Sequence, residues 1–144
     1  MRFCARVLLL CAEQGVPALM ENPQRSLIWR AAPMQRVSRL RQASLAVCDQ
    51  CQYGARWRKA TSLLLVNVPT ALQDRLRLRC GGRAVCDRSG KPHIILSGVD
   101  PVSKKFWTSL AQSYSRGFAR CIADVLSQSF EQQSLVRYKE LCGS

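Results

Sequence analysis

The sequence of 144 residues contains no long apolar run and only nine acidic residues. No hydrophobic stretch approaches the ~20 residues of a membrane-spanning helix, so we expect no contact with a membrane. Residues 1–12 imitate a signal peptide, but Arg6 interrupts their apolar part and Glu13-Gln14 replace the small residues of a cleavage site. We therefore expect an intracellular protein, whose eight cysteines are reduced core residues or metal ligands rather than disulfides.

The shortage of acidic residues leaves a large positive charge. Twenty-two Lys and Arg residues give a formal net charge of +13 and a pI near 10.1. A field of this sign attracts polyanions, most commonly nucleic acid, although a basic surface that only keeps the chain soluble is the alternative. The arginines crowd the middle of the chain at Arg36, Arg39, Arg41, Arg56, Arg58, Arg75, Arg77 and Arg79. We expect a nucleic-acid partner and a nuclear rather than cytoplasmic location.

The pattern of apolar residues favours one α/β domain, without internal repeats or low-complexity tracts. Hydrophobic periodicity predicts helices over residues 2–14, 34–42, 69–78 and 106–130, the last with a break that Ser115 would cap. In the first helix, Phe3, Val7, Leu10 and Cys11 form the expected inner face. Apolar runs predict about four strands, at residues 18–23, 45–48, 61–66 and 94–96, of which the second and third would form an antiparallel hairpin.

Three parts of this single domain differ in composition. Residues 1–68 hold the strand–helix half, residues 69–104 a Cys- and Gly-rich insert, and residues 105–144 the C-terminal helices. In the first part, Glu21 and Asn22 end an apolar run, and ligands of open α/β sheets bind at such strand ends. Glu21 would serve there as a general acid or a hydrogen-bond partner. The alternative is a carboxylate that caps a turn formed by Ser26 and Trp29.

A basic, aromatic loop lies between the second and third predicted strands. Tyr53 and Trp57 interleave with Arg56, Arg58 and Lys59, after a turn that Gly54 permits. Aromatic rings stack on bases and cations contact phosphates, so these residues are candidates for nucleic-acid binding. The alternative is a basic hairpin loop whose aromatic residues are buried.

Cysteines and the single histidine form a candidate zinc site. Zinc takes four thiolate or imidazole ligands in a tetrahedron, which Cys51, Cys80, Cys86 and His93 can supply. Cys48, in a C-x-x-C with Cys51, competes for the first place. The alternative is a scatter of reduced cysteines with a histidine at a strand edge. The remaining cysteines lie in helical patterns and are expected in the core: Cys4, Cys11, Cys121 and Cys142.

Three stretches, in this order, resemble the cytosine-5 DNA methyltransferases. Glu21-Asn22 is similar to their Glu-Asn-Val motif, with Pro23 in place of the valine. The stretch from Tyr53-Gly54 through Lys59 to Val66 resembles the next block, a Tyr-Gly turn followed by Gln-x-Arg-x-Arg and an apolar strand. Residues 111–126 are similar to the closing motif. The run Glu-Asn-Pro-x-x-Ser-x-x-Trp, followed by Cys-x-Tyr-Gly, looks closer still to domains in mobile-element polyproteins of unicellular eukaryotes.

The resemblance covers only the C-terminal half of that family. It implies a partial open Rossmann-like sheet with helices on its sides, and DNA as the nucleic acid. Glu21 would hydrogen-bond a flipped cytosine, and contacts to DNA would come from Asn22, Tyr53, Arg56, Trp57, Arg58 and Lys59. The family's Arg-x-Arg falls on Lys59 and Thr61, and a threonine cannot replace an arginine that holds a base.

Two elements that methyl transfer requires are missing from the sequence. No glycine-rich loop precedes Glu21 to hold the methyl donor, and no Pro-Cys dipeptide supplies a nucleophile. We therefore expect an incomplete methyltransferase-like domain that is inactive alone. S-adenosylmethionine would bind only to a longer parent protein, in which an upstream domain is the partner. The alternatives are a zinc-stabilised nucleic-acid-binding module without catalysis and a non-functional gene fragment.

Overall fold

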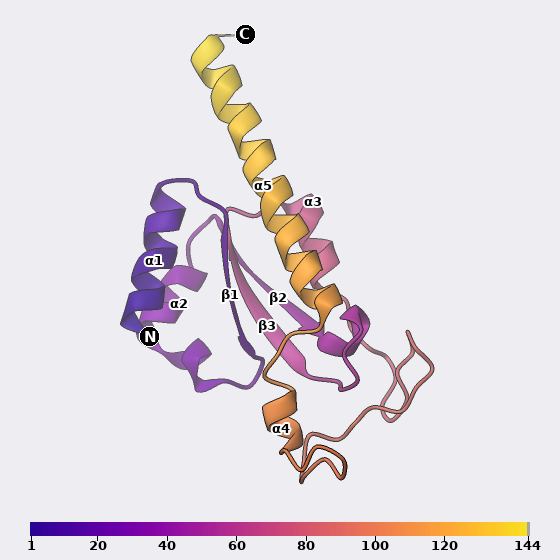
Figure 1. Ribbon diagram of the computed structural model, residues 1–144. Helices are drawn as coiled ribbons and strands as arrows, with labels where there is room; N and C mark the ends of the chain where they lie inside the picture. Colours follow the sequence, from indigo (N-terminus) through magenta and orange to yellow (C-terminus); the bar gives the residue numbers. More distant parts are fainter. Residues whose placement is uncertain (144) are drawn as a thin grey trace.

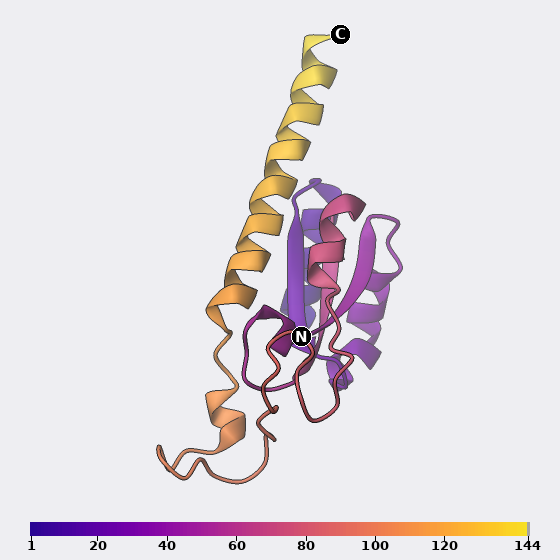
Figure 2. The same ribbon diagram turned by 90° about the vertical axis from the view of Figure 1, so that its right-hand side faces the viewer.

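The computed structural model describes residues 1–143, except for the side chains of residues 141 and 142. A three-stranded antiparallel sheet lies at its centre (Figures 1 and 2). The strands are β1 (Ala18–Pro23), β2 (Ala43–Asp49) and β3 (Ala60–Val66), in the order β1-β3-β2. The central strand is the most apolar one, whereas Pro23 lies at the end of an edge strand, where a missing N–H group is tolerated.

The structure confirms a mixed α/β fold and the predicted antiparallel hairpin, in which Ala46 of β2 lies opposite Leu63 of β3. Among the described residues there is neither a fourth strand nor a Rossmann topology. The predicted strand at residues 94–96 is wrong. The Ile94 N–H donates to the Arg56 carbonyl instead of a strand ladder, and Ile95 is 78% exposed, so this short apolar run never reaches the sheet.

Three consecutive leucines in β3 give the sheet a hydrophobic core on each face. Successive side chains of a strand point to opposite faces. Leu64 therefore packs with α1 (Arg2–Glu13) and α2 (Ala32–Ser38), while Leu63 and Leu65 pack against α5 (Arg116–Cys142). Figure 1 shows α1 and α2 on one side of the sheet and α5 on the other.

Helix α1 confirms the predicted element but buries a different face. Ala5, Leu8 and Ala12 are buried, whereas Phe3 is 76% exposed and Leu10 is 57% exposed. Two alanines on the inner face let the helix lie close to α2 and the sheet, which the larger side chains would prevent. The size of the side chains therefore decided the orientation that periodicity alone predicted wrongly.

The C-terminal region is helical, as expected, and is divided at the predicted break. Helix α4 (Trp107–Leu110) is followed by a turn and by α5, whose first N–H groups are capped by Ser115. The Ser115 Oγ accepts from the Phe118 N–H at 3.2 Å and donates to the Tyr53 carbonyl at 2.8 Å, so the cap is confirmed. The far end of α5 projects beyond the sheet (Figures 1 and 2).

The start of α5 lies unusually close to the chain after β2. A Cβ atom added to Gly117 would stand 2.3 Å from the Tyr53 carbonyl oxygen, so only glycine fits there. This contact brings Phe118 between two aromatic rings, 5.1 Å from that of Tyr53 and 5.4 Å from that of Tyr114. The three rings join α5 to η2 (Gln50–Tyr53), a single 3₁₀ turn that follows β2.

The segment between β3 and α4 begins with two short turns and is then irregular. Helix α3 (Thr70–Gln73) and the 3₁₀ turn η3 (Asp74–Leu76) occupy most of the predicted helix at residues 69–78. Residues 77–106 follow without a helix or strand, and two isolated bridges, Val85–Pro92 and Val99–Phe106, hold them. A further 3₁₀ turn, η1 (Leu27–Arg30), follows β1. Within residues 1–143, no helix combines the length and apolar character that a membrane span requires.

Candidate functional site

Four side chains of the predicted zinc set come together beside the sheet. The ligand atoms of Cys51, Cys80, Cys86 and His93 all lie within 4.8 Å of one another, and the Cys80 Sγ is 3.7 Å from the His93 Nε2. Cys51 comes from η2, and the other three come from the irregular segment 77–106. The three cysteines are at most 3% exposed. A sequence expectation about ligand identity is thus confirmed as a spatial cluster that could hold a metal ion.

The geometry of this cluster fits a small tetrahedral ion. Metal–sulfur bonds of about 2.3 Å at tetrahedral angles place neighbouring ligand atoms about 3.8 Å apart. The Cys80–His93 separation already has this value, and the others need to shorten by less than about 1 Å to reach it. Cys48 does not belong to the group, because it is fully buried between β2 and α5 with Leu63 and Phe118. The competition between Cys48 and Cys51 is therefore decided for Cys51.

His93 is oriented for ligation by a hydrogen bond behind the ring. Its Nδ1 lies 3.1 Å from the Arg83 carbonyl oxygen, which can only accept. The proton therefore belongs on Nδ1, and the lone pair of Nε2 faces the thiols. Histidine ligands in metal sites are typically held in this way.

The loop that carries Cys80 is anchored to the sheet by a buried carboxylate. Asp49, at the end of β2, is fully buried, and its Oδ2 accepts from the Cys80 N–H at 2.9 Å and from the Arg79 Nε at 3.1 Å. Arg58 adds an ion pair to the same oxygen at 3.5 Å. Nothing in the local sequence around Asp49 indicated this role, because its partners come from distant loops.

A second carboxylate closes the loop between the ligands. Asp87 accepts from the Gly81 N–H and from the Gln52 side chain, both at 2.6 Å, and the Gly81 N–H is the largest cause that lowers the pKa of Asp87 to about 2. A Cβ atom on Gly82 would lie 1.8 Å from the Val85 carbonyl oxygen. The turn from Cys80 to Cys86 therefore has no room for a side chain at Gly82, which makes its path compact and well defined.

The thiols of the cluster differ in their electrostatic surroundings. Burial raises the pKa of Cys51 far above its usual range, with the neighbouring thiols of Cys80 and Cys86 as further causes. Burial also opposes ionisation of Cys86, but hydrogen bonds from Ser89 outweigh it and lower the pKa of that thiol. Two of these neighbours at a thiolate, Ser89 and His93, are therefore in place to stabilise charge on Cys86.

The residues predicted to contact nucleic acid are placed very differently from one another. Arg56 and Arg58 are exposed, while Trp57 is half-buried and directs its Nε1 towards the Gln50 side chain at 3.5 Å. Tyr53 is only 6% exposed, its ring packs on Phe118 and its hydroxyl donates to the Arg75 carbonyl at 2.9 Å. The face of the Tyr53 ring is thus closed to a base, since burial in the core outweighed exposure on the loop.

Glu21 lies within β1, opposite Leu63, and not beyond its end. Its Oε2 accepts from the Tyr114 hydroxyl at 2.5 Å, and its Oε1 is buried without a hydrogen-bond partner among the described residues. Burial first, and Glu21 second, raise the pKa of Tyr114 to about 12. The alternative role of Glu21 as a cap of the following turn is not observed, because the Ser26 Oγ accepts from the Ile28 N–H there.

Lys59 and Asn22, two further predicted contacts, lie near this carboxylate. Asn22 is the next residue of β1 and is half-buried. The Lys59 Nζ donates to the Ala111 carbonyl at 3.3 Å, in the turn that also carries Tyr114. Sequence reasoning missed the Glu21–Tyr114 pair because 93 positions separate the two residues and Tyr114 fitted an apolar helical stripe.

The expected core positions of the other cysteines are only partly filled. Cys4, Cys11 and Cys121 are half-buried, and the side chain of Cys142 lies outside the part that the structure describes. Burial raises the pKa of Cys121, as for an ordinary packed thiol. Comparison of the chain with models of protein families, with curated proteins and with solved structures finds no match.

Proposed function

We propose that this chain is a zinc-stabilised module that binds nucleic acid without catalysing a reaction itself. The observation that carries the proposal is the convergence of three thiols and one oriented imidazole within 4.8 Å. Zinc is the metal that this donor set suits best, because soft thiolates and imidazole in a tetrahedron are its usual ligands. Four protein ligands leave no open position for a substrate, which favours a structural role over a catalytic one.

The position of the cluster gives zinc a clear task. Residues 77–106 have no helix or strand, and their largest buried group is the cluster itself, Cys51, Cys80 and Cys86. Bound zinc would tie this segment to η2 and so to the sheet. The segment carries some of the cations of a chain with a net charge of +13, and phosphates are the ligands that such a charge attracts.

The test is binding of fluorescent DNA by zinc-loaded protein at several salt concentrations. We expect about one zinc per chain and an affinity that falls steeply with salt, because each neutralised phosphate releases counterions. Zinc-free protein prepared with a chelator should bind more weakly. Binding that is independent of salt, or equally strong without zinc, would contradict the proposal.

A second candidate function rests on the surroundings of Glu21. The three stretches that resemble cytosine-5 DNA methyltransferases supply Glu21, Lys59 and the turn from Ala111 to Tyr114, and these lie in contact. The unpartnered Oε1 of Glu21 is suited to accept from the amino group of a base. In this case the chain would contribute half of a base-binding site to a longer methyltransferase-like protein.

This candidate can be tested by complementation. The chain is mixed with an upstream half that carries a glycine-rich methyl-donor loop and a Pro-Cys nucleophile, and transfer from labelled S-adenosylmethionine to DNA is measured. We expect labelling, and we expect Glu21→Gln to abolish it because a carboxylate is needed at the base. The exposed Glu131 provides the control, so Glu131→Gln should label like the wild type. Full labelling by Glu21→Gln would remove Glu21 from the site.

A further inference from the structure

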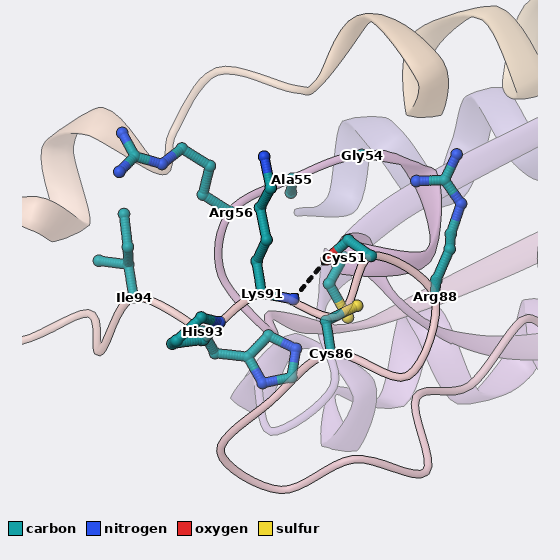
Figure 3. Close-up of a pocket in the computed structure, with 11 residues that line it drawn as sticks. Cys51, Gly54, Ala55, Arg56, Cys86, Arg88, Lys91, His93 and Ile94 are labelled. Atoms are coloured by element: carbon teal, nitrogen blue, oxygen red, sulfur yellow. Dashed lines mark hydrogen bonds between the residues drawn. The ribbon is translucent and has the colours of Figure 1, made fainter.

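A cleft of about 560 Å³ opens directly beside the candidate metal centre. Its lining includes three of the candidate metal ligands, Cys51, Cys86 and His93, and three cations, Arg56, Arg88 and Lys91. In Figure 3, the sulfur atoms of Cys51 and Cys86 lie next to each other, and the long side chains of the three cations extend away from them. The cations thus border a concave space whose floor is the metal centre.

These three cations are free of carboxylates, unlike other arginines of the basic middle region. In residues 1–143, Arg58, Arg75, Arg77 and Arg79 each form an ion pair with an aspartate, whereas Arg56, Arg88 and Lys91 form none. All three are exposed. Their charges are therefore available to an anion from outside the chain.

The cations belong to two loops that the metal centre holds together. Arg56 lies five residues after Cys51, while Arg88 and Lys91 lie between Cys86 and His93. The Ile94 N–H donates to the Arg56 carbonyl at 2.9 Å, and the Cys86 N–H donates to the Lys91 carbonyl at 2.9 Å. Both loops thus depend on the same ligands for their relative position, and the cleft exists only while they stay together.

We propose that this cleft seats one nucleotide of a single-stranded nucleic acid, with its phosphate between Arg56, Arg88 and Lys91, and that this binding is coupled to the metal. The inference rests on the proposed function and specifies its ligand. A divalent ion with three thiolates has a net charge of about −1, so three neighbouring cations leave the cleft positive. The apolar part of the lining, Pro92 and Ile94, provides a surface for a base.

A single strand fits this space better than a duplex. A flexible strand can bend one phosphate and its base into a concavity, whereas in a duplex the bases are stacked and paired inside and only the backbone is presented. Because metal and nucleotide depend on the same loops, each should strengthen the binding of the other by the same factor.

The experiment compares two triple variants that lose the same charge. In the first, Arg56→Gln, Arg88→Gln and Lys91→Gln empty the cleft of cations; in the control, Arg36→Gln, Arg39→Gln and Arg41→Gln remove three exposed arginines on and after α2. The probe is an oligothymidylate of about 12 nucleotides, a length that small single-strand-binding folds cover, and the competitor is a duplex of equal length. Both variants should retain the zinc content of the wild type, which verifies their fold.

We expect the cleft variant to bind the oligothymidylate at least about tenfold more weakly and to lower the slope of log K against log salt by about 2, from ~0.7 per lost phosphate contact. The control should lose less than about threefold by the same electrostatic reasoning. Equal losses in both variants, or preference for the duplex, would overturn the cleft while leaving a nucleic-acid-binding module intact. Absence of any binding by the wild type would overturn both proposals.

The coupling is measured through the metal. The rate at which a chromogenic chelator removes zinc is followed with and without the oligothymidylate. We expect the oligonucleotide to slow zinc release from the wild type and from the control variant, but not from the cleft variant. Identical rates with and without the oligonucleotide in the wild type would overturn the coupling.

Discussion

Replacing Cys80 by serine together with His93 by alanine is expected to abolish zinc binding and to unfold residues 77–106. The physical reason is that this segment has no helix or strand and almost no buried apolar surface of its own. Structural zinc sites bind with about 10–16 kcal/mol of apparent free energy, most of which is folding free energy when no site exists in the unfolded chain. Loss of two ligands should remove nearly all of it.

Metal analysis and hydrogen exchange measure this result. Amides of residues 77–106 should exchange quickly in the double variant, while those of β3 should stay protected, because Leu63, Leu64 and Leu65 pack independently of the metal. The matched control is Cys4→Ser in α1, a half-buried cysteine remote from the cluster in the sequence, which should keep the zinc. A metal-free double variant with protected amides in residues 77–106 would contradict the expectation.

Phe118→Ala should produce the largest loss of stability that does not involve the metal. The ring is fully buried and touches Tyr53 and Tyr114. Removing a buried phenylalanine costs about 3–5 kcal/mol, because a cavity remains where packing and burial are lost. Domains of this size are typically stable by only about 5–15 kcal/mol, so the variant should be largely destabilised.

Urea denaturation of zinc-loaded protein measures this loss as a lower midpoint at an unchanged slope. Phe130→Ala, in the same helix, is the control, because Phe130 is 46% exposed and should cost less than about 1 kcal/mol. Tyr114 also loses a neighbour in the Phe118 variant, so its hydrogen bond to Glu21 should loosen as well. Equal midpoints for the two variants would show that the ring cluster does not hold α5 on the sheet.

Features that depend on neighbouring residues were predictable from the sequence. The hairpin of β2 and β3, the break before Ser115 and its cap follow from short apolar runs and from a serine before a helical pattern. The metal ligands were predictable for a different reason. One histidine and few polar cysteines leave little choice of ligand set, so chemistry replaced the missing information about distance.

Features that depend on packing were not predictable in this way. The orientation of α1 was decided by the small size of Ala5 and Ala12, which periodicity does not weigh. Tyr53 looked like a surface ring in a basic loop, but Gly117 lets α5 approach and cover it. The Glu21–Tyr114 pair required knowledge of how α5 crosses the sheet, which no local pattern contains.

The three leucines of β3 have a consequence for how reliably the sheet forms. A slip of one residue in a strand exchanges its two faces, and here it would place leucine where leucine was. Apolar burial therefore discriminates weakly between the correct pairing and its neighbours. A buried polar contact supplies the difference, because the Gln50 Nε2 donates to the Thr61 Oγ1 at 3.2 Å and would be left unpaired after a slip. The fidelity of folding thus depends on one amide and one hydroxyl more than on the apolar run beside them.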